Sequence, residues 1–152
     1  MIQRIQTLYL LLASSALGLQ FALPYAQVGT DSPAKADPVF ADGVFNLIDN
    51  IGLLGLTGLG LVAGLVAIFL FKNRPLQGRI AAVGMMVSIM LAALCGFALY
   101  QAMSRQYPEG ATVQYQFGMG LGMPILAIAL LWLAQRAIGK DENLVRSMDR
   151  LR

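Results

Sequence analysis

The sequence predicts an all-α membrane protein: an antiparallel bundle of four transmembrane helices with a small extracytoplasmic cap. Mean hydropathy is +0.65 and only 12% of the 152 residues are charged, about half the share of soluble domains. Four apolar segments of bilayer length alternate with short polar connections. The basic residues gather beside alternate connections, as they do when a chain crosses a membrane repeatedly.

We expect one membrane domain over residues 1–152, with spans at residues 5–23, 46–71, 80–101 and 117–138. The second span organises the rest, since no charged residue lies between Asp49 and Lys72. The 21 residues after Asn50 make about 31 Å of helix, enough for a bilayer core of about 30 Å. The first apolar run is longer than that of a signal peptide, so we expect it to remain as a span.

The connections are polar and contain turn-forming residues. Residues 24–45 and 102–116 form the outer loops, residues 72–79 the inner loop, and residues 139–152 a cytoplasmic tail. Alternating patterns predict possible short strands at residues 25–28, 39–40 and 111–117, the last of which could pair with the first loop.

Three residues should mark helix ends. Asp42 is suited to cap the second helix. Pro124 should kink the fourth helix or mark its first turn, and Gly139 should end that helix.

The tail has the pattern of a short amphipathic helix on the inner membrane face. Its apolar residues recur on one face, and its arginines lie largely elsewhere. This candidate docking surface comprises Leu144, Val145, Met148, Leu151, Arg146 and Arg150. Anionic lipid and a cytosolic protein fit these residues equally well.

The distribution of basic residues predicts the orientation. Nine of the 11 basic residues fall on the side that holds both termini, and the outer loops contain only Lys35 and Arg105. The positive-inside rule therefore predicts a multi-pass protein with both termini in the cytoplasm.

A polar cluster at the start of the second span is the main candidate for binding. Asp42, Asn46, Asp49 and Asn50 share much of one helical face. They could bind a cation or proton at the outer mouth, with Gln101, Tyr115 and Gln116 as partners. The alternative is that they cap the helix and complement its dipole.

Small residues recur along the second and third spans at the spacing that lets helix backbones approach closely. The predicted helix-packing residues are Gly52, Gly55, Gly60, Gly64, Gly84, Ser88, Ala92 and Gly96. A pore lining is the alternative interpretation of the same stripes, and close packing explains them better.

The composition argues against most catalytic chemistry. Histidine is absent and Cys95 is the only cysteine, which removes imidazole ligation and any intramolecular disulfide. Phosphate-binding loops, metal quartets and nucleophile elbows are also absent. Methionines in the third and fourth spans suit core filling better than soft-metal ligation. We therefore expect no catalytic, cofactor-binding or metal-binding residues and no enzymatic activity.

Three stretches carry a family resemblance: the opening MIQRIQTLYLLLA, the outer DGVFNLIDN and the closing KDENLVRSMDRLR. Together they resemble an uncharacterised family of bacterial four-span inner-membrane proteins, known only as a domain of unknown function. The resemblance covers the whole chain and implies the topology and the membrane, but no activity.

The sequence thus favours an accessory or structural subunit of a larger bacterial inner-membrane complex. Its expected partners are the lipid bilayer and other membrane subunits, and not nucleic acid. A small channel or transporter with Asp49 and Asn50 at an outer vestibule is the alternative. An enzyme acting on lipid or quinone would need a polar cleft that the sequence does not indicate.

Overall fold

The computed structural model describes residues 5–30, 32–107 and 113–149, which are mostly helical. The helices are α1 (Ile5–Leu19), α2 (Ile51–Phe69), α3 (Arg74–Met103) and α4 (Met123–Asp149). The strands are β1 (Ala26–Val28), β2 (Val44–Phe45) and β3 (Tyr115–Phe117). Short 3₁₀ turns are η1 (Pro33–Ala36), η2 (Pro38–Phe40), η3 (Leu47–Asp49) and η4 (Met119–Gly122).

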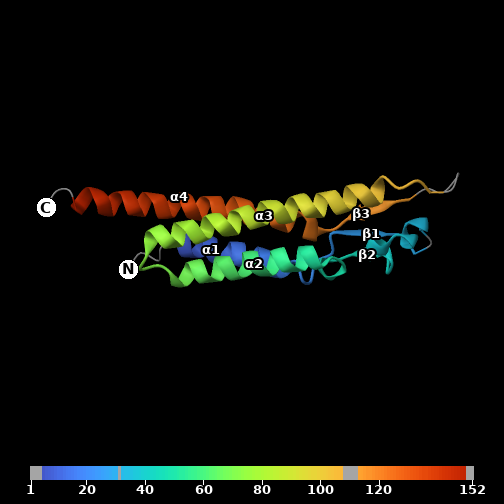
Figure 1. Cartoon of the computed structure of the whole chain (residues 1–152), viewed down its shortest axis with the longest axis horizontal. Helices are drawn as coiled ribbons and strands as arrows, with labels where there is room; N and C mark the ends of the chain where they lie inside the picture. The colour runs from blue at the N-terminus through green and yellow to red at the C-terminus, as the bar shows by residue number, and fades with distance from the viewer. Residues whose placement is uncertain (1–4, 31, 108–112, 150–152) are drawn as a thin grey trace.

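The four helices lie side by side along the long axis of the molecule, and the strands lie at one end (Figure 1). Helix α1 packs against α2 and α4, and α3 packs against the same two helices. The start of α1 and the end of α4 lie at the end opposite the strands (Figure 1). We call these the strand end and the terminal end.

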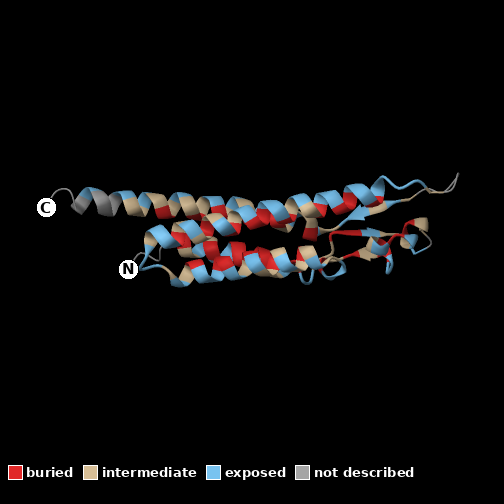
Figure 2. Ribbon diagram, viewed as in Figure 1, coloured by how far each residue is buried: buried red, intermediate tan, exposed pale blue. Residues whose placement is uncertain are grey.

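Three helical segments are long and apolar enough to cross a membrane: Ile51–Phe69, Arg74–Met103 and Met119–Asn143. At most 33% of each apolar window is buried inside the chain. The exposed sides of the helices run along the outside of the molecule (Figure 2) and carry many large apolar side chains. Such a surface suits lipid contact. Helix α1 is apolar but shorter.

The interior between the helices is filled by apolar side chains. Toward the terminal end, Leu10, Ala13, Ala67, Ala81 and Leu131 are fully buried in one cluster. A second cluster runs toward the strands and contains the fully buried rings of Tyr25, Phe40 and Phe45. These rings stack edge-on or tilted, with centroids 5.3 Å apart for Tyr25–Phe45 and 6.2 Å for Phe40–Phe45.

The strands form one antiparallel sheet in the order β2-β1-β3. Ala26 lies opposite Phe45 on one side and Phe117 on the other. The predicted pairing between the two loops is therefore confirmed. Residues 39–40, predicted as a strand, belong to η2 instead, because the Asp37 carboxylate accepts a hydrogen bond from the Val39 N–H and turns the chain.

The first two helices are shorter than the predicted spans 5–23 and 46–71. Helix α1 ends at Leu19, and residues 20–23 continue as turns. Asp42 does not cap α2. The side chain of Asn50 does so, accepting from the N–H groups of Gly52 and Leu53, because η3 separates Asp42 from the helix.

Helix α3 begins inside the predicted inner loop 72–79. Asn73 caps its first turn, with the side chain accepting from the Leu76 N–H, and Pro75 lies in that turn. Proline is tolerated there because the first N–H groups of a helix have no partner within it. The connection from α2 to α3 is thus only residues 70–73.

Helix α4 departs from the predicted span 117–138 at both ends. It begins at Met123 after β3 and η4, and Pro124 lies in its first turn, one of the two predicted roles. Gly139 does not end it, because α4 continues to Asp149. Only Gly43 among the described glycines has a positive φ, so Gly139 has no left-handed cap conformation. The predicted separate tail helix is therefore wrong.

Candidate functional site

The predicted outer polar cluster lies at the strand end, where each member serves the local backbone. The side chains of Asn46 and Asp49 form a capping box around η3, and the Asn46 N–H donates to Asp49 Oδ2 over 2.6 Å. Asp42 accepts from the Val44 N–H at 3.0 Å. Asn50 caps α2. The side-chain oxygens of these residues therefore bind backbone N–H groups of turns and of the start of α2, and they do not form a shared pocket.

The expected partners of that cluster have other contacts. The Tyr115 hydroxyl donates to the Ala102 carbonyl at 3.5 Å. Gln116 lies opposite Gln27 in the sheet, and Gln101 is exposed at the end of α3.

An ion pair that sequence reasoning missed joins the two outer loops. Asp37 Oδ2 lies 2.6 Å from Arg105 Nε, with the Asp37 side chain 2% exposed and that of Arg105 56% exposed. The signal available was that Arg105 and Lys35 are the only basic residues of the outer loops. Burial, the nearby Tyr107 hydroxyl and the charge of Asp37 raise the pKa of Tyr115 beside this pair to about 12.

Several polar side chains are buried between the helices near the strand end. The Tyr25 hydroxyl donates to Gln20 Oε1 at 2.7 Å, and burial raises the pKa of Tyr25. Thr57 and Cys95 are also buried. Ser14 donates to the Leu10 carbonyl at 2.9 Å within its own helix. Tyr25 and Cys95 belong to the largely apolar cluster that runs toward the strands.

The glycines of the second span differ in their surroundings. A Cβ at Gly60 would lie 3.1 Å from Leu17 of α1, and one at Gly64 would collide with the Ser14 hydroxyl. A Cβ at Gly52 would lie 3.1 Å from Leu94 of α3, whereas one at Gly55 would meet nothing within 4 Å. Gly60 and Gly64 therefore adjoin α1.

The small residues of the third span also differ in their surroundings. A Cβ at Gly84 would lie 3.6 Å from Ala63 of α2, and Ser88 is fully buried and donates to the Gly84 carbonyl. Ala92 is half-buried. A Cβ at Gly96 would meet nothing within 4 Å, so Gly96 lies outside the contacts made within one chain.

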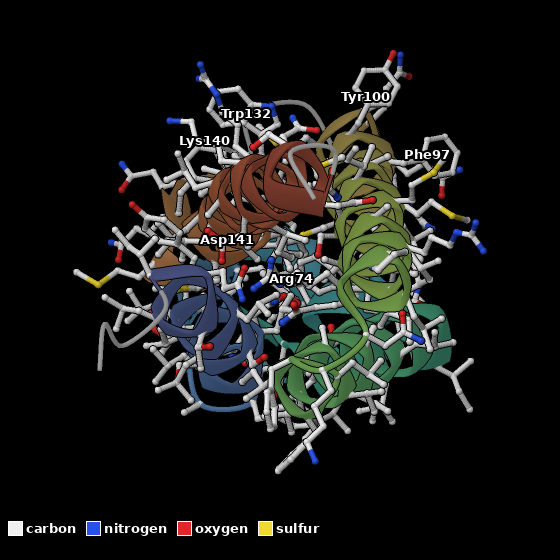
Figure 3. The ribbon with its side chains drawn as sticks, turned by 90° about the vertical axis from the view of Figure 1, so that its left-hand side faces the viewer. Arg74, Phe97, Tyr100, Trp132, Lys140 and Asp141 are labelled. Carbon is white, nitrogen blue, oxygen red and sulfur yellow. The ribbon has the colours of Figure 1, made fainter. Side chains whose placement is uncertain are left out.

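At the terminal end, two side chains of α3 donate hydrogen bonds to backbone carbonyls of neighbouring helices. Arg74 Nη1 donates to the Asp141 carbonyl of α4 at 2.9 Å. Gln77 Nε2 donates to the Ala67 carbonyl at 2.9 Å. Gln6 is 1% exposed, with neither amide atom partnered by a described residue. In Figure 3, Arg74 and Asp141 lie toward the middle of the four helices.

A groove opens between α1 and α4 at the same end. It has a volume of about 410 Å³. Its lining residues are Ile5, Tyr9, Leu133, Arg136, Ala137, Lys140 and Asp141. Basic and apolar side chains occur together in this groove, and no local pattern in the sequence predicts it, because it combines residues of α1 and α4.

The predicted docking residues of the tail fall mostly outside the described residues. The backbone of residues 144–148 belongs to α4, but the side chains of Leu144, Val145, Arg146 and Met148 lie outside the description, as do Arg150 and Leu151. Within the described part of the chain, no three histidine, cysteine or acidic side chains are grouped to hold a metal ion.

The fold defines a mostly helical protein whose three longest helices are apolar enough to cross a membrane, with a three-stranded sheet at one end. Residues 2–151 match the family described as domain of unknown function (DUF4293), so the chain belongs to this family. Comparisons with curated proteins and with solved structures gave no match.

Proposed function

We propose that this protein is a non-enzymatic accessory or structural subunit of a larger complex in a bacterial inner membrane. In this proposal all four helices are spans, the strands form an extracytoplasmic cap, and both termini are cytoplasmic. Its partners are the bilayer and other membrane subunits. The tail end of α4 docks at the cytoplasmic surface.

The observation that carries the proposal is the length of α4 at the terminal end. Helix α4 continues to Asp149 and runs past the ends of the other helices there (Figure 1). A helix extension of this kind gains little stability from its own propensity. It is suited to presenting side chains to a partner.

Open glycines on the membrane-facing helices give further support. Gly55 and Gly58 of α2 and Gly96 of α3 would each accept a Cβ without contact inside the chain. Each glycine costs a helix about 1 kcal/mol relative to alanine, and small residues let another helix approach closely in lipid. Contact with a helix of another subunit explains why glycine rather than alanine occupies these positions.

The apolar interior between the helices favours the subunit proposal over the channel alternative. Asp49 and Asn50 accept hydrogen bonds from backbone N–H groups. The layer between the two ends is filled by apolar side chains such as Leu10, Ala67 and Leu131. Ions would require a polar path through this layer.

The test is purification of the tagged full-length chain from native membranes in mild detergent. We expect other membrane proteins to co-purify at fixed stoichiometry. A variant ending at residue 143 should lose or weaken this association while still inserting into the membrane. The matched control, Gly139→Ala, keeps the helical extension and should retain the partner. A lone monomer under every mild condition would contradict the proposal.

A further inference from the structure

The groove between α1 and α4 has an apolar floor. Ile5 and Tyr9 line it from α1, and Leu133 and Ala137 line it from α4. Ile5 is 56% exposed, while the other three are half-buried. On a helix that crosses a membrane, such a surface contacts acyl chains, because exposing this apolar area to water would cost free energy.

The mouth of the groove carries a positive charge balance. Arg136 and Lys140 are both exposed side chains on its lining, and Asp141 is its one acidic residue. The guanidinium of Arg74 donates to the carbonyl of Asp141 and brings a third cation close to this position. The groups around the groove therefore favour an anion over a cation.

Aromatic residues indicate the depth of the groove. Trp132 is 49% exposed, and the Arg136 guanidinium carbon lies 5.2 Å from the centroid of its ring. In Figure 3, Trp132 and Lys140 project from the outer side of α4. Tryptophan beside arginine and lysine on a membrane helix is typical of the headgroup level.

We propose that this groove binds one anionic phospholipid. The lipid phosphate lies between Arg136 and Lys140, and an acyl chain lies along Leu133 and Ala137 toward Ile5. Guanidinium and ammonium groups recognise phosphate, and basic pockets beside membrane helices bind anionic headgroups. The proposal needs only a bilayer around α1 and α4, so it stands whether or not a partner protein binds the tail.

Native mass spectrometry of the full-length protein, extracted from nanodiscs, tests this. The nanodiscs contain equal amounts of phosphatidylglycerol and phosphatidylcholine. We expect the wild type to retain one phosphatidylglycerol in preference to phosphatidylcholine. Each basic side chain near a membrane surface contributes about a fivefold preference, so R136Q/K140Q should lower retention by more than tenfold.

The matched control is K72Q/R79Q. It removes the same charge from exposed residues at the same end, outside the groove lining, and should leave retention within about twofold of wild type. Equal losses in both double variants would overturn the site in favour of general surface charge. So would a wild type without preference for phosphatidylglycerol.

A second variant keeps the proposal testable if R136Q/K140Q fails to fold. Ala137→Phe fills the apolar floor and leaves both cations in place, and we expect it to lower lipid retention as well. Glycerol phosphate, which has the headgroup without acyl chains, should fail to displace the lipid. Unchanged retention in Ala137→Phe, or displacement by glycerol phosphate, would overturn the assignment to a lipid.

Discussion

At the scale of single residues, polar side chains at the strand end mainly accept hydrogen bonds from backbone N–H groups. Asn50, two residues before Gly52, completes the start of α2, and Asn46 and Asp49 complete η3. The residue types alone predicted capping as one of two alternatives. They predicted the wrong cap for α2, Asp42 instead of Asn50, because the cap depends on where the 3₁₀ turn before α2 begins.

The buried carboxylate of Asp37 should stabilise the cap. Asp37→Ala removes the acceptor for the Val39 N–H and the partner of Arg105. We expect a loss of about 1–2 kcal/mol in the free energy of opening the sheet. Hydrogen exchange of the β1 amides measures this free energy.

Asp42→Ala is the control for that change. Asp42 is exposed and accepts one backbone hydrogen bond, from Val44, so its loss should cost under about 1 kcal/mol. Equal protection of β1 in wild type and Asp37→Ala would show that the ion pair does not hold the loops together.

Tyr115 should make stability depend on alkaline pH. Its pKa is about 12 in the folded chain and about 10 in an unfolded chain. The folded state therefore favours the neutral phenol, so the contribution is complete below pH 10 and is lost as the pH rises through 10 toward 12. We expect Tyr115→Phe to reduce the fall in stability over this interval, as measured by thermal unfolding in detergent. An unchanged slope would contradict this.

At the scale of elements, the contact between α1 and α2 depends on Gly64. A Cβ at this position would collide with the Ser14 hydroxyl. We expect Gly64→Ala to destabilise the packed helices by about 1–3 kcal/mol, measured by unfolding in detergent.

Two variants separate this packing effect from helix propensity. Gly55→Ala adds a Cβ where nothing lies within 4 Å, and it should be neutral or stabilise by up to about 1 kcal/mol. Adding Ser14→Ala to Gly64→Ala should restore much of the lost stability, because it removes the colliding oxygen. Additive losses in the double variant would indicate that the two side chains do not meet.

The continuity of α4 gives a prediction at Gly139. A Cβ there would meet nothing within 4 Å, and the residue lies inside the helix. Gly139→Ala should therefore increase helical content or stability by up to about 1 kcal/mol. Far-ultraviolet circular dichroism of the full-length chain measures it. A loss of helix would indicate a left-handed cap at this glycine.

Hydrophobicity predicted the existence and order of the helices well and their ends poorly. The apolar runs around Gly60, Leu91 and Leu131 are long enough to identify α2, α3 and α4. The starts of α2 and α3 were missed because the asparagine caps at Asn50 and Asn73 act locally, within one turn. The end of α4 was missed because Gly139 lies inside that helix and does not cap it. The Asp37–Arg105 pair and the groove could not be predicted, because each joins segments distant in sequence.

At the scale of the whole molecule, the proposed topology predicts where reporters will be active. Fusions after residue 152 and in the α2–α3 connection at residues 70–73 should report a cytoplasmic location. An insertion in the outer loop near Gly29, where a Cβ would meet nothing within 4 Å, should report the opposite side. The nine basic residues that the sequence pattern assigns to the same side as both termini support this arrangement. Termini on opposite sides would contradict it.

Helix α3 is continuous over its 30 residues, about 45 Å. Arg105 lies just beyond its last turn and holds the buried Asp37, while Arg74 in its first turn holds the backbone of α4. No described hinge interrupts the helix between these two arginines. If α3 crosses the bilayer as proposed, this continuous helix is a rigid connection between the outer loops and α4, through which a displacement on one side of the membrane would reach the other.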